Sequence, residues 1–204
     1  MEIALSTLSS RKSLPLRFSV STIETQGEIQ VKAIEERRSI RTYTNQKIAD
    51  ETVFQLFESA RLAPSGSNSQ PWHFLAITNQ EMREKVAKVS HDQKWMLSAP
   101  LFIVCIAKIE SNTNLYLDET SPEFNLKRGI RDTSIAAEHI VLEATRLGLG
   151  TCWVAWFTQT EIKTLLNLPP DTYVVGILTV GYPDEKPAQR KRKELSEILH
   201  YNTW

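Results

Sequence analysis

The sequence predicts an α+β (mixed α/β) domain in which helices pack over a central sheet. Segments with helical spacing of apolar residues alternate with short apolar runs, in the order α, α, β, α, β, α, β, α, β. One run, residues 101–108, reads as a strand that is buried on both faces. The chain has 204 residues, 41% hydrophobic and 24% charged, which allows one sizeable core and is typical of a soluble globular protein.

The first half of the chain contains three expected helices and one expected strand. The first helix covers residues 28–37. The second begins at Asp50, a good N-cap residue, and has an apolar face made by Val53, Leu56, Phe57 and Ala60. A strand over residues 73–78 follows, and Asn79 then caps a short helix whose inward side chains are Met82, Val86 and Val89.

A long helix dominates the middle of the chain. Residues 109–130 are polar without a strong period and are predicted to be a loop or a short mobile helix. Asp132 is then expected to cap the long helix, and Gly148 to close it in the left-handed conformation. The apolar face of this helix comprises Ile140, Val141, Ala144 and Leu147.

Two further strands enclose a short helix. The strands are predicted over residues 152–157 and 173–180. Thr158 and Glu161 have the spacing of a capping box for the helix between them.

Charge and hydropathy argue against several classes of protein, among them nucleic-acid-binding and membrane-spanning proteins. Formal net charge is zero, so no global field favours nucleic acid or an anionic membrane. The longest apolar stretch, residues 99–107, is far shorter than the roughly 20 residues that span a bilayer. Cys105 and Cys152 lie in apolar runs and are expected to be buried thiols of a cytoplasmic protein. Residues 1–28 are expected to be a poorly ordered tail, and residues 29–204 a single domain.

The first candidate binding motif concentrates cations where a helix gives way to a strand or turn. It consists of Arg37, Arg38, Ser39, Ile40 and Arg41. Guanidinium groups offer forked donors that suit phosphates and carbonyl edges. The alternative interpretation is a solvated basic helix end, balanced by Glu35 and Glu36.

The second motif is the small-residue loop 64–72, PSGSNSQPW. Small residues allow a ligand close to the backbone, and Ser, Asn and Gln supply donors and acceptors. The alternative is an ordinary turn between a helix and a strand. The Pro-Trp pair that ends the loop argues against a turn without function.

The third and fourth motifs lie further along the chain. Residues 148–156, GLGTCWVAW, place two glycines before an apolar strand, and the third glycine of a Rossmann fingerprint is missing. The run 186–193, KPAQRKRK, has five cations and no acid. This run is short and lacks interleaved aromatic residues, so an anion site completed by the N-terminal arginines is favoured over a nucleic-acid patch.

Taken together and in this order, the four motifs resemble those of the nitroreductase family of flavoproteins. The resemblance extends from about residue 31 to residue 199, and PSGSNSQPWHF is its most specific part. It implies a nitroreductase-like fold with a central, mostly antiparallel sheet. It also implies a homodimer in which FMN lies at the subunit interface.

The resemblance also implies that different residues bind different parts of FMN. Arg37, Ser39 and Arg192 would hold the phosphate, with Arg38 nearby, and Arg41 would face the pyrimidine edge of the ring. The loop residues Ser65, Gly66 and Asn68 would contact the ring and the ribityl chain. The remaining cofactor-binding residues are those of the third motif, namely Trp153, Val154 and Ala155, with Ile40 as part of the first.

The implied activity is an NAD(P)H-dependent oxidoreductase that works by a ping-pong cycle. A small acceptor such as a nitroaromatic or a quinone would follow the nicotinamide into the same slot, and no side chain is needed as a general acid or base. Three alternatives remain open. They are a specialised reaction of the same fold, such as reductive dehalogenation or flavin fragmentation; a flavin-binding protein without turnover; and an RNA-binding tail on an unrelated domain.

Two features depart from the family pattern. Many members have a Glu-Gly or Gly-Gly pair where Ala155 and Trp156 stand in this chain. The expected lid over the active site, residues 109–130, is short and unlike that of any recognisable subgroup. Trp72 and Trp156 are both interpreted first as core residues.

Overall fold

The computed structural model describes residues 31–109 and 122–204, with the backbone alone for residues 122–125. The chain divides into two units, which are treated separately. One spans Ile29–Gln189 and contains the sheet; the other includes Arg190–Trp204. The expected N-terminal tail lies outside the described residues, and the single domain over residues 29–204 stays a prediction.

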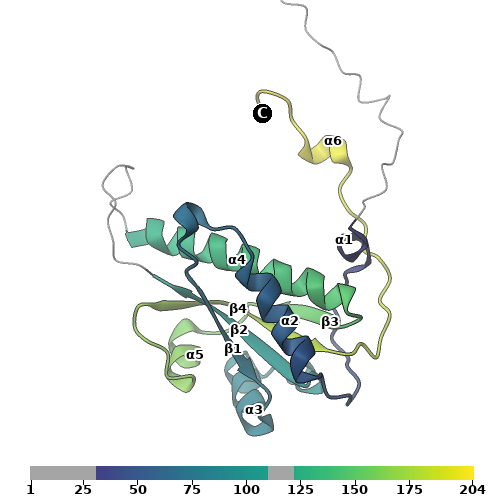
Figure 1. Cartoon of the computed structure of the whole chain (residues 1–204), viewed down its shortest axis with the longest axis vertical. Coiled ribbons are helices and arrows are strands. Elements are labelled where there is room, and N and C mark those ends of the chain that lie inside the picture. The colour runs from purple at the N-terminus through teal and green to yellow at the C-terminus, as the bar shows by residue number, and fades with distance from the viewer. Residues whose placement is uncertain (1–30, 110–121) are drawn as a thin grey trace, which may run out of the picture. The chain divides into compact units, whose positions relative to one another are not determined.

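A four-stranded antiparallel sheet forms the centre of the larger unit (Figure 1). Its strands are β1 (Trp72–Ile77), β2 (Leu101–Lys108), β3 (Gly150–Val154) and β4 (Thr172–Gly181). They lie in the order β1-β2-β4-β3, and each neighbouring pair is antiparallel. The expected mixture of helices with a mostly antiparallel central sheet is therefore confirmed. The bounds of β2 agree with the prediction, and those of the other strands move by one to three residues.

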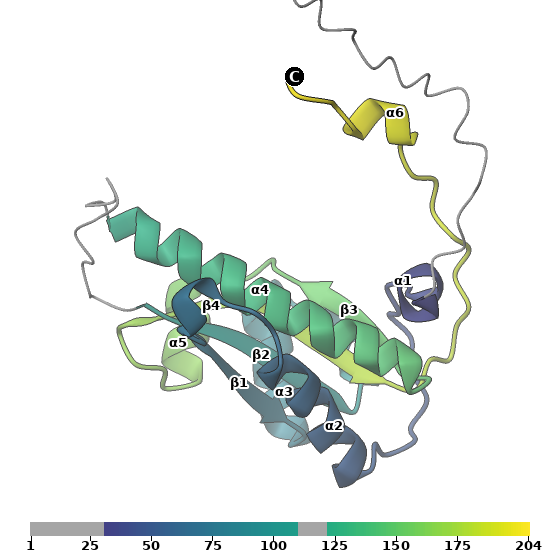
Figure 2. The same ribbon diagram turned by 45° about the horizontal axis from the view of Figure 1, so that its top comes forward.

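Helices cover both faces of this sheet. One face carries α2 (Asp50–Arg61) and α4 (Pro122–Arg146), and the other carries α3 (Gln80–Val89) and α5 (Gln159–Leu165), as Figures 1 and 2 show. A 3₁₀ turn, η3 (Lys94–Ser98), packs with α3 on the second face.

The central strand β2 supplies side chains to both layers. Successive side chains of a strand point to opposite faces. Towards α2 and α4 lie Leu101, Ile103 and Cys105, and towards α3 and α5 lie Phe102, Val104 and Ile106. All six are buried. The expectation of a strand buried on both faces is confirmed, and so are the two free, buried cysteines.

Two predicted helix ends are confirmed in detail. The Asn79 side chain accepts a hydrogen bond of 2.9 Å from the backbone N–H of Met82, the expected N-cap of α3. Gly148 follows α4 with a φ of 76°. Its N–H donates to the carbonyl of Thr145, and the N–H of Leu149 donates to that of Ala144, which together make a Schellman motif.

Two other helix starts were predicted wrongly, and the start of α5 at Thr158 is confirmed without the predicted capping box. Ala49, not Asp50, is the N-cap residue of α2. Asp132 lies inside α4, because this helix already begins at Pro122 and takes up much of the polar segment expected to be a loop. Thr158 precedes α5 without a side-chain cap bond. That helix is fastened instead by the Gln159 amide, which bonds both backbone groups of Val174 at 2.7 and 3.1 Å.

Short helices lie near the two ends of the described chain. Only α1 (Lys32–Glu36) is seen of the helix expected over residues 28–37, whose first three residues lie outside the described ranges. In the smaller unit, α6 (Leu195–Ile198) begins with a capping box made by Glu194 and Glu197.

Candidate functional site

The arginine motif lies against the start of β3. Ser39 forms an isolated parallel bridge with Thr151, and the N–H of Ile40 donates to the carbonyl of Thr151 at 2.9 Å. The backbone approach needs a glycine, because a Cβ on Gly150 would lie 2.6 Å from Cγ1 of Ile40. The first and third motifs, more than 100 residues apart in the sequence, are thus side by side.

Ile40 divides the arginine motif into an anchor and a set of outward groups. Its side chain is buried in the core with 6% exposure, whereas Ser39 and Arg41 on either side are exposed. Arg38 donates to the backbone carbonyls of Glu35 and Arg37 at 2.6 and 2.8 Å. Among the described residues, the guanidinium groups of Arg37 and Arg41 make neither an ion pair nor a hydrogen bond.

The backbone at Arg41 is held by residues that the sequence did not single out. The Glu185 carboxylate accepts hydrogen bonds from the N–H groups of Arg41 and, at 3.1 Å, Thr42. The Ser98 hydroxyl donates to the Arg41 carbonyl at 3.3 Å. The Arg41 guanidinium carbon lies 5.8 Å from the ring centroid of Trp95. The backbone is therefore fixed while the cationic head stays available to a ligand.

A buried cluster of polar groups lies beneath this segment. It consists of the Tyr43 hydroxyl, the Ile40 carbonyl and the Thr179 hydroxyl. The Tyr43 hydroxyl donates to the Ile40 carbonyl at 2.5 Å and lies 2.7 Å from Oγ1 of Thr179. Burial raises the pKa of Tyr43 above its usual range, so the phenol stays a neutral donor. Burial also raises the pKa of the Cys152 thiol, although Arg41 and Arg37 oppose this shift. Both cations therefore act on the same part of β3.

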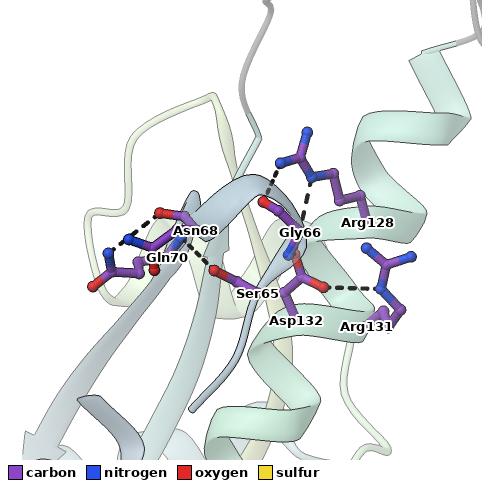
Figure 3. Close-up of polar contacts among 7 residues, drawn as sticks. All are labelled: Ser65, Gly66, Asn68, Gln70, Arg128, Arg131 and Asp132. Atoms are coloured by element: carbon purple, nitrogen blue, oxygen red, sulfur yellow. Dashed lines mark hydrogen bonds and ion pairs between the residues drawn. The ribbon is translucent and has the colours of Figure 1, made fainter. Parts of the chain in front are cut away.

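The second motif folds into a compact loop with unusual backbone angles. Three residues have φ values in the left-handed region, which residues other than Gly rarely adopt: 52° at Ser67, 54° at Asn68 and 47° at Gln70. The Ser65 hydroxyl accepts from the N–H of Gln70 at 3.0 Å, and the Gln70 amide donates to the Asn68 carbonyl at 3.2 Å (Figure 3). Within the described residues, Oγ of Ser69 is buried without a partner.

Three residues of α4 hold this loop from one side (Figure 3). The N–H of Gly66 donates to the Asp132 carboxylate at 3.0 Å, and Arg128 donates to the Gly66 carbonyl. Arg131 donates from Nε to the other Asp132 oxygen at 2.8 Å. This cluster was not predicted from the sequence, because Arg128 was expected in a loop and Asp132 as a helix cap. The signal was the spacing of Arg128 and Asp132, one helical turn apart.

Side chains are buried or half-buried to the end of β3 and become exposed directly after it. Val154 is buried and Trp153 half-buried against the core, whereas Ala155 is exposed. Trp156 is 65% exposed and stacks on His91, with ring centroids 4.3 Å apart. Its interpretation as a core residue is therefore wrong, whereas Trp72 does pack against the core.

The structure thus brings the first and third motifs together and fastens the second to α4. Arg192 belongs to the unit that contains residues 190–204, and its position is described within that unit alone. Two surface hollows of the larger unit, one along α5 and one between α3 and η3, contain none of the predicted binding residues.

Comparison with known proteins identifies the family. The sequence model of the Nitroreductase family matches residues 34–182. The chain belongs to the nitroreductase family. It is 32% identical over 161 residues to a provisionally named NADH dehydrogenase/NAD(P)H nitroreductase of Archaeoglobus fulgidus, covering 76% of this chain and 87% of that protein.

Solved structures agree with this assignment. The structure of NfrA2 from B. megaterium superimposes with a TM-score of 0.78 at 27% identity, over 85% of this chain and 74% of that one. A nitroreductase family protein of Clostridium difficile gives a TM-score of 0.71 at 29% identity, over 85% and 98%. At the level of the family, the predicted class of enzyme is confirmed: an oxidoreductase that works with FMN and NAD(P)H.

The donor set of this nitroreductase fits such a cofactor. The guanidinium groups of Arg37 and Arg41, which make no ion pair or hydrogen bond in the described part of the chain, suit a phosphate and an electron-rich ring edge. The buried hydroxyl of Ser69 lacks a partner among the described residues. In the same residues, no helix is long and apolar enough to cross a membrane, and no three His, Cys, Asp or Glu side chains gather as a metal site.

The contact between Gly150 and Ile40 can be tested by stability. We expect Gly150→Ala to lower the free energy of unfolding by about 1–3 kcal/mol, because the new methyl overlaps Ile40. Ile40→Ala removes two of the overlapping carbons. The double variant should therefore be more stable than the sum of the single effects by at least about 0.5 kcal/mol in urea unfolding. Gly150→Ala combined with Leu56→Ala, on the opposite face of the sheet, should be additive; additivity with Ile40→Ala would contradict the contact.

Proposed function

We propose that this protein takes hydride from NAD(P)H and passes the electrons, through FMN, to a small acceptor such as a nitroaromatic or a quinone, in ping-pong order. One observation carries the proposal. Two arginines, Arg37 and Arg41, present guanidinium groups that make no hydrogen bond or ion pair among the described residues, from a segment whose backbone is bonded to β3 at Ile40. Fixed and unpaired cations are expected where an anionic ligand completes the charge balance.

The proposed roles of the residues follow their positions in the chain. Arg37 and Ser39 would hold the phosphate together with Arg192, whose part rests on the sequence alone. Arg38 lies between Arg37 and Ser39, and its Nη1 already donates to two backbone carbonyls. The ring and ribityl chain would be contacted by Ser65, Gly66 and Asn68, and by the backbone of Trp153, Val154 and Ala155. Ile40 would contribute its backbone, since its side chain is buried.

Arg41 would contribute most of the electrostatic stabilisation of the reduced flavin. When bound, FMN would provide the hydride and electron transfer chemistry of the reaction. A reduced flavin carries negative charge at its pyrimidine edge, and a preorganised cation there stabilises it without reorganisation. Glu185 and Ser98 hold the Arg41 backbone, so the cation would be in place before the charge develops.

A second copy of the chain would complete each site. The β3 strand is at the edge of the sheet, so part of its backbone points away from β4. Large apolar side chains that remain exposed near α1 and α2 suit burial in an isologous interface; they are Val31, Ile34, Phe54 and Leu62. The proposal includes a cytoplasmic location, consistent with two free thiols.

The visible spectrum of the purified protein tests the proposal directly. We expect a yellow protein that bleaches on anaerobic addition of NAD(P)H and recolours when a quinone or a nitro compound is added. A yellow protein that does not bleach would indicate a binding role without turnover. A colourless protein that fails to take up FMN would contradict the flavin site altogether.

Arg41→Ala should weaken FMN binding about tenfold, because one charge-assisted contact is lost. It should also slow flavin reduction by on the order of 10²-fold, because the developing charge loses its cation. Stopped-flow absorbance of the FMN-loaded variant measures the second effect. Arg61→Ala is the matched control, since Arg61 pairs with Glu58 on an exposed helix surface. Unchanged reduction kinetics in the loaded Arg41→Ala variant would remove its role.

Arg192→Ala tests the phosphate assignment. We expect this variant to lose most of the preference for FMN over riboflavin, by about tenfold in the ratio of the two dissociation constants. Lys193→Ala, in the same basic run, should keep the preference. Flavin fluorescence titration measures both constants. An Arg192→Ala variant that still distinguishes the two flavins as well as the parent would overturn the assignment.

A further inference from the structure

The loop of residues 65–70 is tied to α4 at a single residue. Gly66 donates its N–H to Asp132 at 3.0 Å, and its carbonyl accepts from Arg128. Both backbone polar groups of one loop residue are thus bound by side chains of one helix. Figure 3 shows Arg128 and Asp132 on α4 converging on Gly66.

Asp132 is an unusual residue for the interior of a helix. Its side chain is only 1% exposed, and a buried carboxylate is unfavourable unless it is paired and hydrogen-bonded. Here one oxygen accepts from Gly66 and the other from Arg131, with Arg128 Nε 3.9 Å from the first oxygen. The buried charge is therefore satisfied partly by the loop itself, so that loop and helix are coupled.

The backbone conformation of the loop explains why another element must hold it. The contacts of Asp132 and Arg128 with Gly66 are called the clamp below. Three of its residues that are not glycine, Ser67, Asn68 and Gln70, have positive φ values. Backbone in this region persists only where the surroundings over-determine it. The bonds from Gln70 to Ser65 and Asn68 close the loop on itself but do not fasten it to the domain. The contacts of Gly66 with α4 do.

The side chains of α4 also pack closely against Gly66. A Cβ built on Gly66 would lie 3.1 Å from Nε of Arg128 and 3.2 Å from a terminal nitrogen of Arg131. The two guanidinium groups therefore lie directly on the glycine backbone.

We infer that Asp132 and Arg128 are positioning residues for flavin binding: they hold loop 65–70 in its bound conformation without touching the cofactor. The inference rests on the proposed function, in which Ser65, Gly66 and Asn68 contact the ring and ribityl chain. Preorganised loops bind more tightly because the ordering has already taken place. Loss of the clamp should weaken all flavins equally, since the loop does not face the phosphate.

The clamp is tested first in the apoprotein, by hydrogen exchange of peptides that cover residues 63–71. Asp132→Ala and Arg128→Ala should each raise the exchange rate of this segment at least about tenfold, because the Gly66 contacts of both side chains are lost. Asp132→Leu keeps most of the volume but removes the acceptor for the Gly66 N–H, and serves if the alanine variant does not fold. Arg146→Ala is the matched control: Arg146 lies on the same helix and, among the described residues, pairs with the nearby Glu143. Unchanged exchange in both Asp132→Leu and Arg128→Ala would overturn the clamp.

Flavin affinity then separates positioning from mere stability. We expect Asp132→Leu and Arg128→Ala to raise the dissociation constants of FMN and riboflavin by the same factor, on the order of tenfold. Arg37→Ala, in contrast, should affect FMN alone. Exchange that rises while both affinities stay at the parent's values would show a structural role only and overturn the inference. A parent protein that binds neither flavin would overturn the proposed function, and the apoprotein exchange would still decide whether α4 holds the loop.

Discussion

The burial of β2 on both faces is the constraint on which the rest of the structure depends. This antiparallel strand packs apolar side chains against α2 and α4 on one side, and against α3 and α5 on the other, so it supplies packing and no candidate binding group. The candidate binding groups are found instead at the β3 edge and in the connecting segments. The sheet acts as a rigid base, and the candidate site is assembled around its margin.

The arginines of this protein differ more in what surrounds them than in their spacing. Arg38 donates from Nη1 to two backbone carbonyls, and Arg128 and Arg131 are bound to Gly66 and Asp132. Arg37 and Arg41 have no such partners among the described residues. The division between structural and available cations follows from the neighbours of each guanidinium group, because a donor that is already bonded has little to offer a ligand.

Much of the fold and the outline of the site could be predicted from local sequence. The apolar run of β2, the Asn79 cap and the Gly148 ending are local signals, because each depends on residues within one or two turns. Membership of the nitroreductase family could be expected from the order of four motifs. The same local logic failed at Asp132, where a residue type favoured at helix starts lies mid-helix because its carboxylate bonds a loop residue 66 positions earlier.

The sequence by itself determined the type of each strand and long helix, the motifs that contain the candidate binding residues, and the class of enzyme. Tertiary structure alone decided which arginines stay unpaired among the described residues, that Ile40 is an anchor, that Trp156 stacks on His91 at the surface, and that Glu185 and Asp132 support the two candidate binding segments. The physical reason is the distance along the sequence over which each interaction acts. Periodicity and capping act between neighbours in the chain, whereas the pairing of buried charges and of free backbone groups depends on residues that only folding brings together.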